Sequence, residues 1–274
     1  MKKIIFTAFF GAAFVAGAQA KLVLSGSDTL AGAMTDVIIQ AGLDQSISYV
    51  GGGSGVGEKN LLAGDQGIAP MSREIKSDVL AALQAQGNAV VGHVLGLDGI
   101  SIFVHTGNAT PNLDVATVAK IFGCEVTRWE QIPGSGLKGD IHAFRRNNES
   151  GTTDAFKNFT GIKAFGACVV ILTETADIAD KTSRDVLAVG YSGLSGKVTG
   201  NREVAISPKA GAAAVMPTTV TIRNGSYPFA RKLYVYEVTG SRKANDIELM
   251  MLDFLTDRSF MDPIMQAHEF ITLD

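Results

Sequence analysis

Apolar and polar residues follow one another in blocks that predict repeated strand, loop and helix units. Leu22 to Leu24 is a short apolar strand, and the polar loop Ser25 to Thr29 leads into apolar positions with helical spacing from Leu30 to Ile38. The same order returns after Ile47 to Val50, where a glycine-rich loop precedes a helix that reaches Leu62. Such repeats favour an α/β fold with a parallel sheet, whose ligands bind at the loops beyond the carboxyl ends of the strands.

A third unit of the same kind follows the strand Gly67 to Ala69. Its loop, Pro70 to Glu74, precedes a helix around Val79 to Leu83. Thr29 and Ser72 stand before the first and third helices, and a Ser or Thr hydroxyl at such a place accepts hydrogen bonds from the free amides of the first turn. We therefore expect both residues to cap these helices.

The longest apolar stretch of the mature chain runs from Val90 to Val104. Its polar residues are few, with Asp98 as the single acid. The stretch predicts one long strand, buried on both faces, that crosses between two lobes. Lys232 to Glu237 predicts a second strand that returns to the first lobe. Roughly 250 residues are enough for either one large core or two smaller ones.

The middle of the chain predicts an α/β second lobe. Its expected elements are Val115 to Phe122, the strand Ile141 to Phe144, the loop Arg145 to Thr152, the helix Thr153 to Phe159 and the strand Val186 to Tyr191. Asp246 to Leu255 and Met261 to Met265 predict C-terminal helices of the first lobe. The expected organisation is a leader at residues 1–20, lobe 1 at residues 21–97 and 232–274, and lobe 2 at residues 98–231.

The first twenty residues have the pattern of a secretory signal peptide. Lys2 and Lys3 precede the apolar run Ile4 to Ala16, and Ala18 to Ala20 forms an A-x-A cleavage site. The run is shorter than the roughly 20 residues that a membrane-spanning helix needs. We therefore expect a mature chain that begins at Lys21 and is free in the periplasm.

Charge and cysteine content reduce the number of possible partners and cofactors. The formal net charge is −3, and loss of two leader lysines makes the mature chain more negative, which disfavours nucleic acid as a partner. The cysteines are Cys124 and Cys168. An oxidising compartment favours a disulfide between them over a zinc site, because the histidines are scattered along the chain. No metal or other cofactor is expected.

The loops that open the predicted helices combine the residues of an oxyanion site. A helix N-terminus offers free amides and about half a positive charge, and the loops containing Thr29 and Ser54 add hydroxyls. The loop Arg145 to Thr152 adds guanidinium groups, which can hold two oxygens at once. Each such Ser or Thr alone is usually an ordinary helix cap. Their combination favours a bound oxyanion.

Asp98 is the most informative acid, because its apolar neighbours predict burial and a buried carboxylate needs a partner. It can accept the proton of a monohydrogen oxyanion. Alternatively, it caps a turn at Gly99. Asp28, between Ser27 and Thr29, is the second candidate acceptor.

These motifs occur in the order found in one family. They are Ser27-Asp28-Thr29, Gly51 to Gly55 with Ser54, Ser72-Arg73-Glu74, Arg145-Arg146 with Ser150-Gly151-Thr152, and Tyr227-Pro228 before Leu233 to Tyr236. The chain thereby resembles the periplasmic phosphate-binding proteins of phosphate ABC transporters, along nearly the whole mature length. The resemblance implies a type II periplasmic-binding-protein fold, with two α/β lobes, two crossing strands as hinge, and phosphate between the lobes.

The resemblance also implies a set of ligand-binding residues. They are Thr29, the amide of Leu30, Ser54, Arg146, Ser150, Gly151 and Thr152. Many family members carry a ligand-binding Asp where this chain has Ser72, so Asp98, on the first crossing strand, is expected to supply the missing carboxylate. Of the two neighbouring arginines, Arg146 is expected to face the cleft, because successive residues of a strand point to opposite sides.

The implied partners are inorganic phosphate and the ABC transporter permease in the inner membrane, and the protein is expected to be a monomer without catalytic residues. A hydrolase is disfavoured because no G-x-S-x-G elbow is present, Ser54 being followed by Gly55-Val56. Nucleotide binding is disfavoured because Glu58 precedes Lys59 in the P-loop-like run. Another tetrahedral oxyanion as ligand, or a phosphate-binding adhesin of the same fold, remain alternatives.

Overall fold

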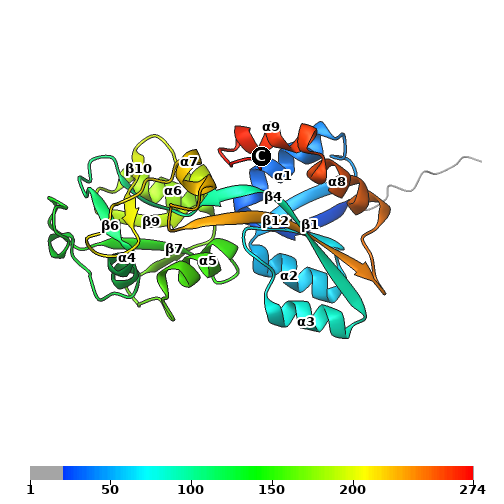
Figure 1. The fold of residues 1–274 in the computed structure, drawn as a ribbon, viewed down its shortest axis with the longest axis horizontal. Coiled ribbons are helices and arrows are strands. Elements are labelled where there is room, and N and C mark those ends of the chain that lie inside the picture. Colours follow the sequence, from blue (N-terminus) through cyan, green and yellow to red (C-terminus); the bar gives the residue numbers. More distant parts are fainter. Residues whose placement is uncertain (1–20, 274) are drawn as a thin grey trace, which may run out of the picture.

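The computed structural model describes residues 21–273, which form two α/β lobes side by side (Figure 1). The predicted signal peptide lies outside the described residues. Two long antiparallel strands, β4 (Asn88–Gly99) and β12 (Ala230–Gly240), join the lobes. The α/β fold class with two lobes and two crossing strands is therefore confirmed.

Lobe 1 contains the N-terminal and C-terminal parts of the chain. Strands β1 and β2 pair in parallel, and helices α1, α8 and α9 pack around a shared core of residues such as Leu24, Met34 and Met261. The elements of lobe 1 are β1 (Leu22–Gly26), the 3₁₀ turn η1 (Asp28–Leu30), α1 (Ala31–Gln40), β2 (Ile47–Gly52), α2 (Ser54–Ala63), β3 (Ile68–Met71), α3 (Ser77–Ala85), α8 (Asp246–Thr256) and α9 (Arg258–Ala267).

Lobe 2 contains the middle of the chain around a five-stranded sheet of order β10-β5-β9-β7-β8. Its core includes stacked rings of Phe156 and Tyr191, whose centroids lie 3.9 Å apart. The elements are β5 (Ser101–His105), β6 (Asn112–Asp114), α4 (Val115–Phe122), η2 (Trp129–Gln131), β7 (His142–Arg146), α5 (Gly151–Thr160), β8 (Val170–Leu172), α6 (Thr175–Arg184), β9 (Ala188–Ser192), η3 (Leu194–Gly196), β10 (Asn201–Glu203), β11 (Ala205–Ser207) and α7 (Thr219–Arg223).

The parallel pairing predicted from the repeated units is present between β1 and β2, but β3 pairs antiparallel with β12, and the sheet of lobe 2 is mixed. Strand β7 runs parallel to β8 and β9, but β5 runs antiparallel to both β9 and β10. Strand β5 enters lobe 2 directly from the crossing strand, whereas β7 connects to β8 through the helix α5, and β8 connects to β9 through the helix α6. Only a connection of the second kind returns the chain to the same edge of the sheet and produces parallel neighbours.

The apolar stretch from Val90 to Val104 is two strands and not one. It breaks at Ile100, whose amide donates to the carbonyl of Phe229. The part before the break pairs with β12, and the part after it pairs with β9. The stretch is also not buried throughout, because β4 is an edge strand of the sheet β3-β12-β4 and Val91 is 43% exposed.

Two predicted helix caps were wrong. Thr29 lies inside η1, and α1 starts after Leu30 without a capping side chain. Ser72 lies ahead of α3, which begins at Ser77 after Lys76. Neither hydroxyl is therefore used as a helix cap, and both are available for other contacts.

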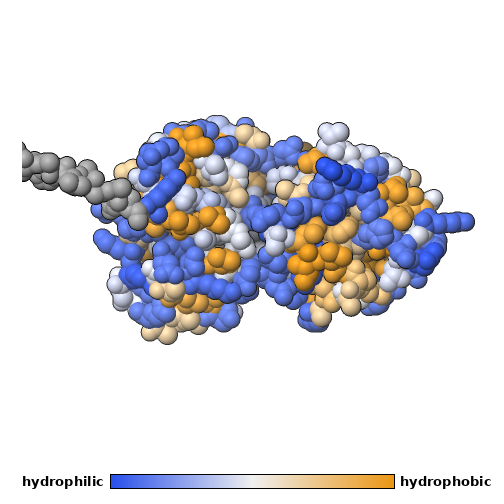
Figure 2. Space-filling model, turned by 180° about the vertical axis from the view of Figure 1, so that it is seen from behind, coloured by the Kyte–Doolittle hydropathy of each residue, from blue (hydrophilic) through white to orange (hydrophobic). Residues whose placement is uncertain are grey.

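The predicted disulfide between Cys124 and Cys168 is present, with the two Cα atoms 6.0 Å apart. It links the end of α4 to the segment before β8 in lobe 2. Within residues 21–273, no helix is long and apolar enough to cross a membrane. Seen from behind, the surface narrows between the two lobes (Figure 2).

Candidate functional site

The loops that follow β1, β2, β3 and β7 meet where the two lobes face each other. Helix α2 begins at Ser54 after Gly53, a residue with a φ of 116° that favours glycine. Helix α5 begins at Gly151 in the opposite lobe. A side chain at Gly151 would collide with the hydroxyls of Ser54 and Ser72. The glycine therefore lets the N-terminus of α5 approach the loops of lobe 1 closely.

Four hydroxyls of the predicted set lie in this contact. Thr29 Oγ1 of lobe 1 is 3.0 Å from Thr152 Oγ1 of lobe 2. Ser54 Oγ is 3.4 Å from Ser72 Oγ and accepts a hydrogen bond of 3.1 Å from the Ser72 amide. All four residues are buried. The structure thus gathers residues that are far apart in the sequence into one polar cluster between the lobes.

Two other members of the predicted set have local partners. The Leu30 amide donates to the carbonyl of Ser27 over 3.2 Å, and the Leu30 side chain is part of the lobe 1 core. Ser150 Oγ accepts a hydrogen bond from the Thr153 amide, so Ser150 is the N-cap of α5. Its hydroxyl proton is still able to donate to a ligand.

The two neighbouring arginines at the end of β7 point to different sides. Arg145 donates to the carbonyl of Arg146 and to Asn148, and its guanidinium lies 4.4 Å from the ring centre of Phe165. Arg146 Nη1 donates to Asp28 of lobe 1 over 2.6 Å and to Thr175 over 2.8 Å. Arg146 is 1% exposed, yet its Nε and Nη2 have no hydrogen-bond partner among the described residues.

Asp28 forms a second contact between the lobes, with Glu174. Burial opposes ionisation of Asp28, but the hydrogen bond from Glu174, the charge of Arg146 and the bonds from Thr175 lower its pKa overall. The hydrogen bond to Asp28, partial burial and the negative charge of Asp28 raise the pKa of Glu174 to about 7. Below about pH 7, the proton of this pair therefore resides on Glu174 rather than on Asp28.

Asp98 lies in the cluster, but it is paired with a residue that the sequence reasoning missed. Arg231 stands opposite Asp98 in the register of β4 and β12. Its Nε and Nη2 donate to Asp98 Oδ2 over 3.0 and 2.6 Å. Asp98 Oδ1 accepts a hydrogen bond from the Leu194 amide. The carboxylate is fully buried and receives three donors.

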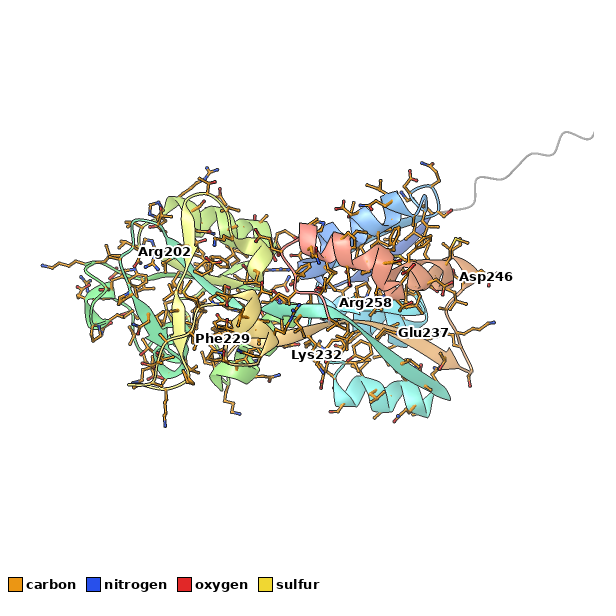
Figure 3. The ribbon with its side chains drawn as sticks, turned by 45° about the horizontal axis from the view of Figure 1, so that its top comes forward. Arg202, Phe229, Lys232, Glu237, Asp246 and Arg258 are labelled. Atoms are coloured by element: carbon orange, nitrogen blue, oxygen red, sulfur yellow. A yellow bond between two sulfur atoms is a disulfide. The ribbon has the colours of Figure 1, made fainter. Side chains whose placement is uncertain are left out.

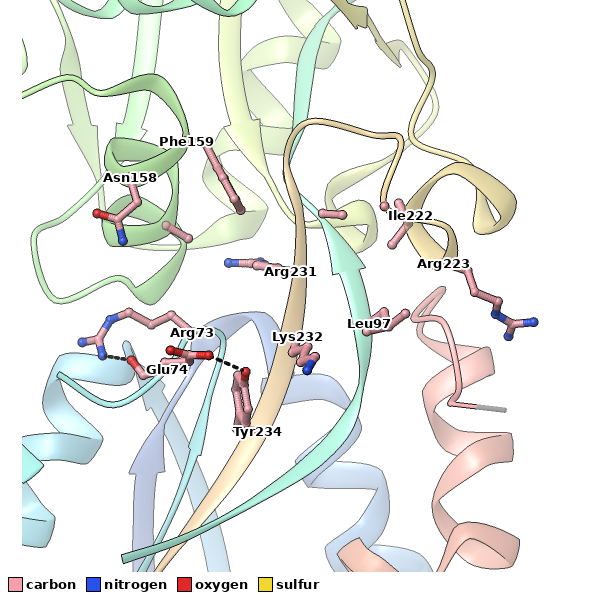
Figure 4. A pocket seen from close by; sticks show the side chains of 13 residues that line it. Arg73, Glu74, Leu97, Asn158, Phe159, Ile222, Arg223, Arg231, Lys232 and Tyr234 are labelled. Atoms are coloured by element: carbon pink, nitrogen blue, oxygen red, sulfur yellow. Dashed lines mark hydrogen bonds between the residues drawn. The ribbon is translucent and has the colours of Figure 1, made fainter. Parts of the chain in front are cut away.

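Arg231 lies between this cluster and a neighbouring cavity, and Lys232 lines the same cavity. Phe229, Lys232 and Glu237 follow one another from lobe 2 toward lobe 1 (Figure 3). Arg231 extends from β12 toward the side of Arg73, where it helps to line a cavity of about 510 Å³ (Figure 4). This cavity shares only Arg231 with the polar cluster. A second cavity, of about 640 Å³, reaches Asp28, Thr29 and Glu174 on the other side.

No group of three or more His, Cys, Asp or Glu side chains suited to a metal ion occurs within residues 21–273. The cluster offers mainly hydrogen-bond donors to a ligand. Hydroxyls, a helix N-terminus and two buried guanidinium groups converge there, and their positive charge is partly balanced by Asp28 and Asp98. Such a set suits a small anion whose oxygens accept hydrogen bonds.

Two lobes, two crossing strands and a polar cluster between the lobes define the class of protein. A family model described as the PBP superfamily domain matches residues 12–257. The chain belongs to this superfamily of periplasmic binding proteins.

Among its relatives is the phosphate-binding protein PstS of Pseudomonas aeruginosa. The two chains are 31% identical over 238 residues, which cover 80% of this chain and 73% of PstS.

Solved structures show the same fold. A proposed phosphate ABC transporter substrate-binding protein from Clostridium perfringens, with bound phosphate, has a TM-score of 0.80 at 22% identity. That match covers 93% of this chain and all of the other. An ABC-type phosphate transport receptor from Vibrio cholerae has a TM-score of 0.72 at 19% identity, with 92% of this chain and 100% of the receptor covered.

Proposed function

We propose that this protein captures inorganic phosphate between its two lobes and delivers it to an ABC importer. The single observation that carries the proposal is the buried guanidinium of Arg146, two of whose nitrogens have no partner among the described residues. A buried donor without a partner is costly, so a site of this kind calls for an anionic acceptor. The PstS relative is named for the phosphate that it binds.

The proposed ligand set is the one predicted from the sequence. Hydroxyls of Thr29 and Ser54 from lobe 1 and of Thr152 and Ser150 from lobe 2 replace the water that a phosphate ion loses on burial. Arg146 supplies the positive charge, the amide of Gly151 adds a donor, and the amide of Leu30 adds another when it exchanges the Ser27 carbonyl for the ligand. Ser72 contributes a hydroxyl in place of the family's carboxylate. Asp98 is included in the proposed site as the partner of Arg231, and the variant Asp98→Asn tests whether it also accepts the phosphate proton.

Lobe closure follows from donors that lie on both sides. The ligand gains contacts to lobe 2 only when the lobes approach each other, and this difference in contacts shifts the equilibrium toward the closed form. Further contacts support the closed form. Arg73 of lobe 1 donates to Asp154 of α5 over 2.9 Å, and Lys59 lies 2.8 Å from Glu149. The transporter would then recognise the closed protein.

We further propose the features that the sequence predicted around this function. The lobes are divided at residues 97 and 231, the permease in the inner membrane is the partner, and the mature protein is a monomer in the periplasm after removal of residues 1–20. The cluster contains no nucleophile paired with a base, which supports a binding role rather than catalysis.

Calorimetric titration tests the proposal directly. Protein that has been unfolded, stripped of phosphate and refolded is titrated with phosphate, sulfate and molybdate. We expect phosphate to bind with one site per chain and more tightly than the other two ions. No heat with phosphate, in a protein whose circular dichroism shows the native fold, would overturn the proposal. Tighter binding of sulfate or molybdate would instead assign another tetrahedral oxyanion.

Two further measurements separate the alternatives. Turnover of phosphate esters would indicate a hydrolase, and we expect none above the uncatalysed rate. Deletion of the gene should abolish high-affinity phosphate uptake. Normal uptake together with a loss of surface attachment would indicate a phosphate-binding adhesin.

A further inference from the structure

Arg231 connects both walls of the cleft from its position on the returning crossing strand. Nη1 donates to Thr152 Oγ1 of lobe 2 over 2.9 Å and to the Ser72 carbonyl of lobe 1 over 3.2 Å. Nη2 donates to Thr29 Oγ1 of lobe 1 over 3.4 Å. Together with the two bonds to Asp98, these contacts use all five N–H groups of a guanidinium.

Because these donors are all engaged, Arg231 has no N–H group left to bind the ligand. Arg231 therefore influences ligand binding through the orientation of the side chains that it contacts. A guanidinium can only donate, so Thr29 Oγ1 and Thr152 Oγ1 must both accept from it. Each hydroxyl has one proton, and the two oxygens lie 3.0 Å apart. Only one of the two protons can lie between them, so the other must point elsewhere.

The negative charge of Asp98 offsets the free-energy cost of burying the Arg231 guanidinium in the cleft. Asp98 provides the opposite charge directly across the two crossing strands, at 2.6 Å from Nη2. An unpaired guanidinium at this depth would carry a large desolvation cost. The carboxylate also fixes the plane of the guanidinium through its two-point contact, so that Nη1 and Nη2 are aimed at the threonines.

We infer that Arg231 is a positioning residue that holds the hydroxyl pair of Thr29 and Thr152 in place, so that the proton not used between them is donated to an oxygen of the bound anion. The inference rests on the proposed phosphate function, which it deepens. Without Arg231, neither hydroxyl oxygen is held by a guanidinium donor, and both side chains can rotate away from the cleft. The ligand then has to order them, which lowers its affinity.

The experiment is a double-mutant cycle on phosphate affinity with Arg231→Lys and Thr152→Val. Lysine keeps the positive charge beside Asp98, but its single ammonium group cannot also span the two threonines. We expect each single variant to weaken phosphate binding about tenfold or more. In the double variant, the loss should be clearly smaller than the product of the two single losses, because both changes remove the same oriented hydroxyl.

Lys232→Gln is the matched control, since Lys232 is the exposed neighbour on the same strand, and it should bind phosphate as the wild type does. Thermal unfolding without ligand reports any loss of structure. A role confined to folding would lower the melting temperature and leave the two losses in affinity independent. Should Arg231→Lys not fold, the paired variant Asp98→Asn with Arg231→Gln removes both charges together, and the same tenfold loss is expected.

The outcomes are distinct. Wild-type affinity in Arg231→Lys, or losses that multiply in the double variant, would overturn the positioning role while the phosphate function stands. Absence of phosphate binding in the wild type would overturn the phosphate function and this inference with it. Coupled losses in the cycle, with the control unchanged, support the inference.

Discussion

Arg146 of lobe 2 and Asp28 of lobe 1 are joined by a hydrogen bond of 2.6 Å between Nη1 and Oδ2. The pair links the loop after β1 to the end of β7, two segments that belong to opposite lobes. It therefore forms when the lobes are together. It also leaves Nε and Nη2 of Arg146 for a ligand, so one side chain connects lobe closure with anion binding.

Replacing the two neighbouring arginines one at a time tests this arrangement. Arg146→Ala should weaken phosphate binding by about 2 kcal/mol or more, the range for losing a charged hydrogen-bond partner. Arg145→Ala should change the affinity much less, because Arg145 contacts Asn148 and the ring of Phe165. Isothermal titration with phosphate measures both. Equal losses in the two variants would contradict the assignment of Arg146 to the site.

Much of the site could be predicted from the sequence because loops that follow parallel strands meet at one edge. Thr29, Ser54 and Thr152 each follow a strand and stand at or near the start of a helix, and that pattern is local. The topology of the fold then brings them together. Opposite directions for Arg145 and Arg146 could be predicted as well, because alternation along a strand depends on the backbone alone.

Arg231 could not be predicted in the same way. Its importance depends on the register of two antiparallel strands that are more than one hundred residues apart, since that register places it opposite Asp98. In the sequence it precedes Lys232 and looks like part of a basic pair on a strand. An isolated acid in one crossing strand and a base in the other was the only available signal.

The sequence pattern also could not predict where one strand ends and the next begins. Ile100 is as apolar as its neighbours, and the break there arises because the chain exchanges β12 for β9 as its partner. Strands such as β10 (Asn201–Glu203) and β11 (Ala205–Ser207) contain three residues each, too few to show a period.

The disulfide should stabilise lobe 2 substantially. Cys124 and Cys168 are separated by 44 positions, and closing a loop of that size in the unfolded chain corresponds to about 2–4 kcal/mol. Cys124→Ser with Cys168→Ser should lower the free energy of unfolding by this amount in urea denaturation. Wild type treated with reductant should behave like the double variant. Native protein exported to the periplasm should contain no free thiol, and two titratable thiols would contradict the bridge.

Asp98→Asn distinguishes two roles for the buried carboxylate. As the partner of Arg231, Asp98 mainly supplies charge and orientation, so its loss should weaken phosphate and sulfate by similar factors. As acceptor of the phosphate proton, its loss should improve sulfate binding and reduce the phosphate-to-sulfate ratio by about tenfold or more. We expect the first result in titrations with both ions. The second result would restore the proton-acceptor role, and an unchanged ratio makes Asp28→Asn the next variant to titrate.

The carboxyl pair of Asp28 and Glu174 should make the closed state of the lobes sensitive to pH. The hydrogen bond to Asp28, together with partial burial and the charge of Asp28, raises the pKa of Glu174 from its usual 4.5 to about 7. Below that pKa, Glu174 carries a proton that it donates to Asp28, and this bond holds the lobes together. As the pH rises through about 7, Glu174 loses the proton and two carboxylates face each other.

The sign of the effect follows from the direction of the shift. A carboxyl group whose pKa is raised in the folded, closed state stabilises that state fully below its unfolded pKa and loses this contribution as the pH rises toward 7. Glu174→Gln keeps an uncharged donor at every pH. We therefore expect the affinity of the wild type, relative to that of Glu174→Gln, to decrease as the pH rises from 4.5 through about 7, and to level off above that. The titration of phosphate itself is common to both proteins and cancels in this ratio. A ratio that stays constant, or one that increases with pH, would show that Glu174 does not hold the lobes together.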